Sequence, residues 1–157
     1  MKRTACLFIC AAFLALTAFE CGDRELCCDF PPCSEIASLK GIWRLDYFQN
    51  TVTGAIDTDP EVDGKSVVFT FEDDKKNGVI SGHTFVNTVG GSYTLGPNCT
   101  FKIVSFGGTK VGEPEWSRKA WLPSDSISGK GSYHISSDKL ILKFDQNQEQ
   151  LVFKKDK

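Results

Sequence analysis

Hydrophobic residues recur at every second position in short runs from Ile42 to the C-terminus, and this alternation limits the fold more than any other feature. A period of two puts alternate side chains on opposite faces of a strand, so each run predicts a half-buried β-strand. Glycine, proline and asparagine separate the runs and supply turns. The runs assign these side chains to inward faces: Trp43, Leu45 and Tyr47; Val67, Phe69 and Phe71; Phe101, Ile103 and Ser105; Leu140, Leu142 and Phe144; Leu151 and Phe153.

The breaks between the runs predict where the chain turns. Asn77 and Gly78 predict a tight hairpin turn, because both residue types accept positive backbone angles. The returning strand is expected over 79–87 and a further short strand over 92–95, after Gly90 and Gly91. Residues 114–122 predict one or two helical turns, and residues 132–136, 139–144 and 150–154 predict three closely spaced strands.

The same order of elements occurs twice. A strand, a long connection and three close strands fill residues 42–95 and again residues 101–154. The expected fold is therefore mostly β: a compact antiparallel barrel or sandwich built from a duplicated unit, with one short helix near 114–122. The chain is 157 residues long, which suits one such domain. We place that domain at 35–157.

The charge of the chain excludes one class of partner. Lys and Arg number 18 against 20 Asp and Glu, which gives a formal net charge of −2, and the two signs are mixed along the chain. A nucleic-acid binder would normally show a basic stripe, so no nucleic acid is expected as a partner.

The N-terminus has the layout of an export signal. Lys2 and Arg3 precede an apolar run over residues 5–19, which is shorter than the roughly 20 residues that span a membrane. Residues 1–20 are therefore predicted to be a cleaved signal peptide. Cleavage before Cys21, as in a bacterial lipobox, would place lipid on that thiol and anchor the protein in the envelope. Glu20 departs from the small residue of the lipobox, and cleavage after Thr17 or Ala18 would give a secreted protein.

Residues 21–34 are expected to form a tether rich in cysteine and proline. Once the signal is removed and Cys21 is acylated, an even number of cysteines remains, and disulfides persist in the oxidising compartment outside the cytoplasm. These cysteines are Cys27, Cys28, Cys33 and Cys99. A bond between adjacent Cys27 and Cys28 is geometrically poor, so we expect disulfides that join the tail to itself or to Cys99. The spacing does not suit zinc, and no metal or cofactor is expected.

A motif near the middle of the chain resembles the signature of the META, or HslJ-like, domain family, G-x-x-G-C-N-x-x-x-G-x-Y. The residues in register are Gly82, Asn87, Gly91 and Tyr93. Thr109 resembles the family's threonine, and Trp43-Arg44-Leu45 resembles its opening W-x-L. Val86 and Glu113 stand where the family has a pair of cysteines, so the chain resembles a divergent member over residues 39–153.

The resemblance implies a β-rich domain with a duplicated unit, found on exported or lipid-anchored bacterial proteins, without established catalysis. Taken as residues alone, the glycines and Asn87 suit backbone geometry at a strand corner more than a ligand site.

Few residues suggest catalysis or metal binding. His83 and His134 are the only histidines, and neither lies in a recognisable catalytic motif. The acidic loop has the register of a calcium loop only in part, because Thr70 stands where a bidentate Glu is required. The acidic residues of that loop are Asp57, Asp59, Glu61 and Asp63. Trp116 and Trp121, in the long connection, are interpreted as a lid on the core or, alternatively, as an exposed recognition surface.

Together these features predict a non-enzymatic module of the bacterial envelope, in the outer membrane or periplasm, or a secreted form of it. It would act by binding an envelope protein or by supporting the envelope under stress. The alternative is a lipocalin-like carrier, whose inward aromatic residues would line a cavity for a small apolar ligand.

Overall fold

The computed structural model describes residues 38–157, and the predicted signal peptide, the tether and Cys21, Cys27, Cys28 and Cys33 lie outside the described residues. The elements, in chain order, are β1 (Gly41–Asn50), β2 (Ile56–Thr58), the 3-10 turn η1 (Val62–Gly64), β3 (Val68–Asp73), β4 (Asn77–His83), β5 (Thr88–Leu95), β6 (Thr100–Gly108), the single helical turn α2 (Glu115–Arg118), β7 (Lys130–Ile135), β8 (Lys139–Phe144) and β9 (Glu149–Lys155). No helix among these residues is long and apolar enough to cross a membrane.

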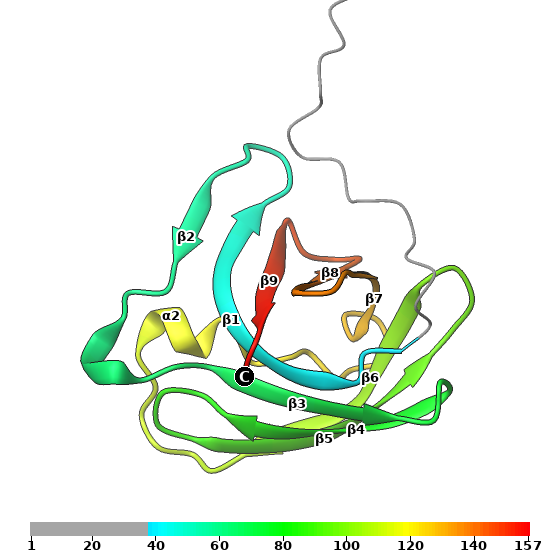
Figure 1. Ribbon diagram of the computed structural model, residues 1–157, viewed down its shortest axis with the longest axis horizontal. Helices are drawn as coiled ribbons and strands as arrows, with labels where there is room; N and C mark the ends of the chain where they lie inside the picture. The colour runs from blue at the N-terminus through cyan, green and yellow to red at the C-terminus, as the bar shows by residue number, and fades with distance from the viewer. Residues whose placement is uncertain (1–37) are drawn as a thin grey trace, which may run out of the picture.

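All nine strands belong to one antiparallel sheet in the order β2-β1-β3-β4-β5-β6-β7-β8-β9, and a further pairing between β1 and β9 closes it. Figure 1 shows β1 and β3 to β9 as a ring, with β2 attached outside it. This architecture confirms the mostly β prediction and the duplicated unit, since β1 and β6 are each followed by a long connection and three consecutive strands.

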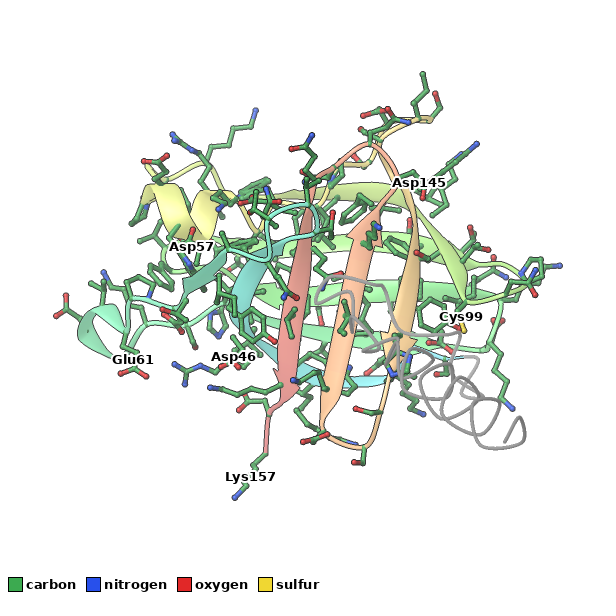
Figure 2. All side chains as sticks on the ribbon, turned by 90° about the horizontal axis from the view of Figure 1, so that it is seen from above. Asp46, Asp57, Glu61, Cys99, Asp145 and Lys157 are labelled. Carbon is green, nitrogen blue, oxygen red and sulfur yellow. The ribbon has the colours of Figure 1, made fainter. Side chains whose placement is uncertain are left out.

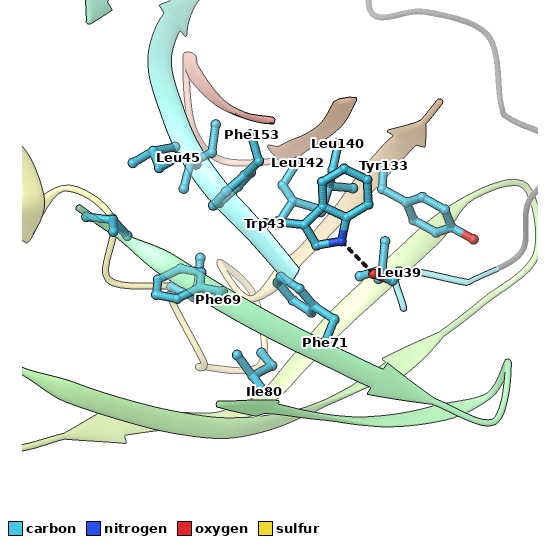
Figure 3. Packing of buried hydrophobic residues seen from close by; sticks show 14 of the residues in the cluster. Leu39, Trp43, Leu45, Phe69, Phe71, Ile80, Tyr133, Leu140, Leu142 and Phe153 are labelled. Carbon is cyan, nitrogen blue, oxygen red and sulfur yellow. Dashed lines mark hydrogen bonds between the residues drawn. The ribbon is translucent and has the colours of Figure 1, made fainter. Parts of the chain in front are cut away.

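Aromatic and aliphatic side chains fill the inside of the ring. Trp43, Phe69 and Phe71 are at most 1% exposed, and Figure 3 shows them packed between the strands. The indole N–H of Trp43 donates to the carbonyl of Leu39 at 3.0 Å, so the one polar atom of this buried ring is satisfied. The inward faces predicted for the β3, β8 and β9 runs are confirmed by burial.

Two inward faces were predicted wrongly, and both errors come from β-bulges. The register of β1 with β9 shifts between Leu45 and Tyr47, so Phe48 points inward instead of Tyr47. The register of β6 with β5 shifts at Val104, so Ser105 is exposed and Phe106 packs against the core. A bulge adds one residue and reverses the side-chain alternation beyond it. Each duplicated unit carries such a bulge in its first strand.

The turn between β3 and β4 also differs from the prediction. A hairpin forms there as predicted, but Asn77 and Gly78 already belong to β4, and the residue with positive φ is Lys75 at 74°. The Asp74 carboxylate accepts the N–H groups of Lys76 and Asn77 at 2.9 and 2.7 Å and so stabilises the turn. β4 ends at His83 and β5 begins at Thr88, earlier than predicted, and the helix is confined to four residues.

Candidate functional site

The motif residues gather at one end of the β4–β5 hairpin and along it. Gly82 is the penultimate residue of β4, Asn87 closes the turn, and Gly91 and Tyr93 lie in β5. The turn is held by the N–H of Thr84, which donates to the carbonyl of Asn87 at 2.8 Å. Thr109 follows the end of β6, which pairs with β5, and so comes back beside Asn87.

Asn87 connects the hairpin turn to the long connection after β6. Its Oδ1 accepts the hydroxyl of Thr109 at 2.9 Å and the N–H of Val111 at 2.8 Å. Its Nδ2 donates to the carbonyl of Val111 at 3.0 Å and to the carboxylate of Glu113. Asn87 is 2% exposed, and both the oxygen and the nitrogen of its side-chain amide form hydrogen bonds within the protein. These bonds replace the hydrogen bonds to water that are lost on burial.

Glu113 completes this network. Its carboxylate accepts the Thr84 hydroxyl at 2.7 Å and the Ser117 hydroxyl at 2.5 Å, in addition to Nδ2 of Asn87. Burial acts to raise the pKa of Glu113, but the hydrogen bonds from Ser117, Thr84 and Asn87 outweigh it and hold the pKa below its ordinary value. We call Thr84, Asn87, Thr109, Glu113 and Ser117 the Glu113 clasp.

The clasp was only partly foreseen. The resemblance marked Asn87 and Thr109, while Thr84 and Ser117 were not singled out, and Glu113 was noted only as a missing cysteine. The position of Glu113 could have revealed its role. In the pattern that the motif resembles, positions 86 and 113 hold a pair of cysteines, and here position 113 holds an ionisable side chain.

Two motif glycines are required by close backbone approach. A Cβ on Gly82 would lie 2.1 Å from the carbonyl oxygen of Val68, and one on Gly91 would lie 2.2 Å from that of Ser105. Real Cβ atoms do not come so near a backbone oxygen, so any larger residue would push the neighbouring strand away. This geometry supports the structural interpretation of the motif.

Tyr93 lies at the other end of the hairpin with its hydroxyl on a carboxylate. The hydroxyl donates to Oδ2 of Asp73 at 2.8 Å, and the N–H of Leu39 donates to the same oxygen at 2.9 Å. Burial, followed by the hydrogen bond and charge of Asp73, raises the pKa of Tyr93, so the phenol stays protonated. The pKa of Asp73 is lowered, because these donors outweigh its desolvation.

An open hollow of about 770 Å³ lies beside Tyr93 on the outer face of β3 to β6. Its lining includes exposed Val79 and Val104 with the hydroxyls of Ser92 and Thr94. A second, smaller hollow of about 340 Å³ lies where β5 and β6 meet β7. Each lining also includes one buried core residue, Tyr93 in the first hollow and Phe101 in the second.

The two tryptophans of the long connection lie against the core. Trp116, 9% exposed, stacks on Phe85 with ring centres 5.6 Å apart and meets Phe48 edge-on at 5.3 Å. Trp121 is half-buried and contacts Phe106 edge-on at 5.8 Å. Trp116 therefore acts as a lid on the core and offers little open surface for recognition.

The histidines and the acidic loop do not form a common centre. His83 lies on β4 and His134 on β7, with β5 and β6 between them in the sheet. Asp57 pairs with Lys119 at 2.9 Å and Asp59 with Arg44 at 3.3 Å. Within residues 38–157 no three His, Cys, Asp or Glu side chains come together in a way that could hold a metal ion.

Comparison with known proteins adds information on the fold alone. No known protein family matches the sequence, and no curated protein matches it. A protein from Burkholderia xenovorans, whose structure was determined by NMR, has a similar fold with a TM-score of 0.56. It is 20% identical, and the match covers 74% of this chain and 82% of that one. The META-like resemblance therefore stays a prediction.

Proposed function

We propose that this protein is an exported, META-like module of the bacterial envelope that acts by binding and not by catalysis. The observation that carries the proposal is the structural use made of the Glu113 clasp, in which a carboxylate lies among the hydroxyl groups of Thr84 and Ser117. Thr84, Asn87 and Ser117 are at most 2% exposed and direct their polar atoms at Glu113. These groups hold a turn and a connection together, and a substrate would have to displace them.

Export is supported by a cysteine outside the predicted tail. Cys99 is 5% exposed and disulfide-bonded, and residues 38–157 contain no other cysteine, so its partner lies outside the described residues. Structural disulfides persist in oxidising compartments and are rare in the cytoplasm. This agrees with the predicted signal peptide.

The packed interior favours a surface-acting module over the lipocalin-like carrier. A carrier needs inward aromatic residues to line an empty cavity, whereas here Phe69 contacts Phe71, Phe106 and Phe153 with ring centres 5.7 to 6.4 Å apart. A small ligand would therefore bind on the outside of the ring, where the two open hollows lie.

Native mass spectrometry of the full-length gene product, purified from a Gram-negative envelope, tests the proposal. We expect a chain that begins at Cys21, carries lipid and retains no small molecule. The matched variants are Cys21→Ser, which should lose the lipid, and Cys27→Ser, which should keep it. A chain beginning near Ala18 with a small molecule released on activation would contradict the anchored form and favour the carrier. An unprocessed chain in the cytoplasm would contradict export.

A further inference from the structure

β2 is an edge strand attached outside the ring. It consists of three residues, Ile56–Thr58, and pairs only with the part of β1 that β3 leaves uncovered. In the sheet order it is the terminal strand, and Figure 1 shows no strand on its other side. Every other strand in residues 38–157 has a partner on both sides because β1 and β9 close the ring.

The hydrogen bonds at the two ends of β2 show which backbone groups face outward. The N–H of Asn50 donates to the carbonyl of Ala55 at 2.8 Å, and the N–H of Asp59 donates to the carbonyl of Asp46 at 3.0 Å. In an antiparallel ladder alternate residues bond to the same neighbour, so residues 55, 57 and 59 face β1. The N–H and C=O groups of Ile56 and Thr58 therefore point to the free side.

Contacts with the rest of the domain hold β2 and its flanking residues in place. Asp57 is tied to α2 by the 2.9 Å ion pair with Lys119, and its carbonyl accepts the indole N–H of Trp116 at 3.3 Å. Arg44 holds Asp59, and the N–H of Thr51 donates to the carbonyl of Gln148 at 2.7 Å. An edge that is already ordered loses little conformational entropy when a partner binds.

Aliphatic side chains stand exposed beside the free edge. The exposed fractions are 70% for Val52, 57% for Ile56 and 43% for Val62. Exposed aliphatic residues at an edge invite pairing, while the three-residue length of β2, Asp57 and the nearby Pro60 limit any added strand to a short segment. Three such residues on one projecting segment are typical of a surface that another chain covers.

The charge next to the edge indicates the kind of chain. Glu61 and Asp63 are exposed and form no ion pair with any residue that the structure describes, while Asp57 and Asp59 are already neutralised. A second copy of this protein, added antiparallel about Asp57, would bring no Lys or Arg from residues 51–63 to the carboxylates of Glu61 and Asp63. A segment with Lys or Arg would meet Glu61 and Asp63 favourably.

We propose that β2 accepts an extended, basic segment of a partner protein as an added strand. The β2 edge consists of the outward backbone groups of Ile56 and Thr58 and the side chains of Val52, Ile56, Glu61, Val62 and Asp63. Main-chain bonds to the edge provide affinity, the aliphatic side chains contact alternate residues, and the carboxylates select positive charge. The inference rests on the proposed function, because it names the surface and partner class of the binding module.

Three six-residue peptides test the proposal by NMR titration of the isotope-labelled, exported protein. The first alternates lysine and valine, the second alternates glutamate and valine, and the third is the lysine peptide with N-methyl groups on alternate amides. We expect the lysine peptide to shift the amide signals of Ile56 and Thr58 and slow their hydrogen exchange. Both control peptides should bind roughly tenfold more weakly or not at all, since each lacks one required interaction.

Two variants sharpen the test. Thr58→Pro removes an outward N–H without removing a bond to β1 and should abolish binding, whereas Thr58→Val keeps the N–H and should bind normally. Glu61→Gln combined with Asp63→Asn should weaken only the lysine peptide. The amide signal of Val79 is the control in the titration. Val79 is 55% exposed, but it lies on β4, which is paired on both sides, so its amide signal should not shift.

The results that would contradict the β2 inference can be distinguished from one another. Equal binding of the N-methylated peptide, shifts centred on the hollow beside Val79, or no binding of the lysine peptide would each overturn the β2 inference. Concentration-dependent dimers with shifts at Ile56 and Thr58 would show that a second copy occupies the edge and would overturn the basic partner. Failure here, with a processed and lipidated chain in the mass spectrum, leaves the proposed function standing, whereas an unprocessed chain removes the proposed function itself.

Discussion

Glu113 joins two segments that are distant in the sequence, the β4–β5 turn and the connection before α2. Its carboxylate has three side-chain donors around it. Hydrogen bonds to a charged group are stronger than neutral ones, so the clasp joins the β4–β5 turn to the connection before α2 without a covalent bond.

Replacement of Glu113 by alanine should destabilise the domain by about 2 kcal/mol or more, because the buried side chains of Thr84, Asn87 and Ser117 would lose their charged acceptor. Urea unfolding followed by tryptophan fluorescence measures the change. Glu115→Ala is the matched control, since Glu115 is exposed two residues away and should change stability by no more than about 0.5 kcal/mol. Equal unfolding midpoints for the two variants would show that the clasp contributes nothing.

Acid should weaken the same interaction. The pKa of Glu113 in the folded protein lies below its ordinary value of 4.5, so its contribution is complete above that value and is lost as the pH falls through the lowered pKa. Glu113→Gln should therefore be less stable than the wild type near neutral pH and should approach it in acid. Urea midpoints of both proteins across this pH range give the difference. A difference that grows as the pH falls would refute the assignment.

Gly78 is required by a side chain on the neighbouring strand rather than by a turn. The Tyr93 ring lies over it, and a Cβ there would be 2.2 Å from Cζ of that ring. Gly78→Ala should cost about 1–3 kcal/mol, as expected for overpacking of a buried site. Gly107→Ala, with nothing within 4 Å of its Cβ, should be neutral or slightly stabilising. Thermal unfolding compares the two, and similar melting temperatures would contradict the close contact.

At the scale of elements, the β-bulges explain where the pattern of inward residues was misjudged. Periodicity identified β1 and β6 correctly, but a register shift in each strand exchanges Tyr47 for Phe48 and Ser105 for Phe106. An extra residue in a strand shows only in its pairing with another strand, and that pairing is not visible in the local sequence. Likewise, the turn before β4 depends on Asp74 rather than on the Asn-Gly pair.

The short helix α2 contributes to the packing of the domain through the side chain of Trp116. Trp116 covers Phe48 and Phe85 and binds the carbonyl of Asp57, so α2 links the core to β2. Trp116→Ala should cost about 3–5 kcal/mol, the usual range for a buried tryptophan. Trp121→Ala should cost clearly less, because that ring is only half-buried. Chemical denaturation separates them, and a larger effect at Trp121 would contradict the lid.

At the scale of the whole molecule, stability depends on closure between the two ends of the described chain. β9, the last strand of the second duplicated unit, pairs with β1 of the first unit. This pairing extends from Trp43 to Asn50 of β1. Figure 2 shows β9 beside β8 in the wall of the ring, so both of its sides are paired. Removing it would expose the edges of β1 and β8 together with the interior that Leu151 and Phe153 fill.

A chain ending after Phe144 should therefore fail to fold cooperatively, because it loses both a core layer and closure of the sheet. A chain lacking only Lys157 is the control and should unfold like the full-length protein, since this residue is exposed. Circular dichroism during heating distinguishes them. A sharp transition in the shorter chain would show that the ring is not a single cooperative unit.

The sequence by itself determined the fold class, the duplicated order of strands and most inward residues, because alternation and turn residues act over a few neighbouring positions. Through the resemblance it also marked Asn87 and Thr109, separately, among the motif residues. Only the tertiary structure decided the closure of β1 on β9, the positions of the bulges, the Glu113 clasp and the free edge of β2. These features depend on which distant segments become neighbours, and that is decided by packing of the whole ring.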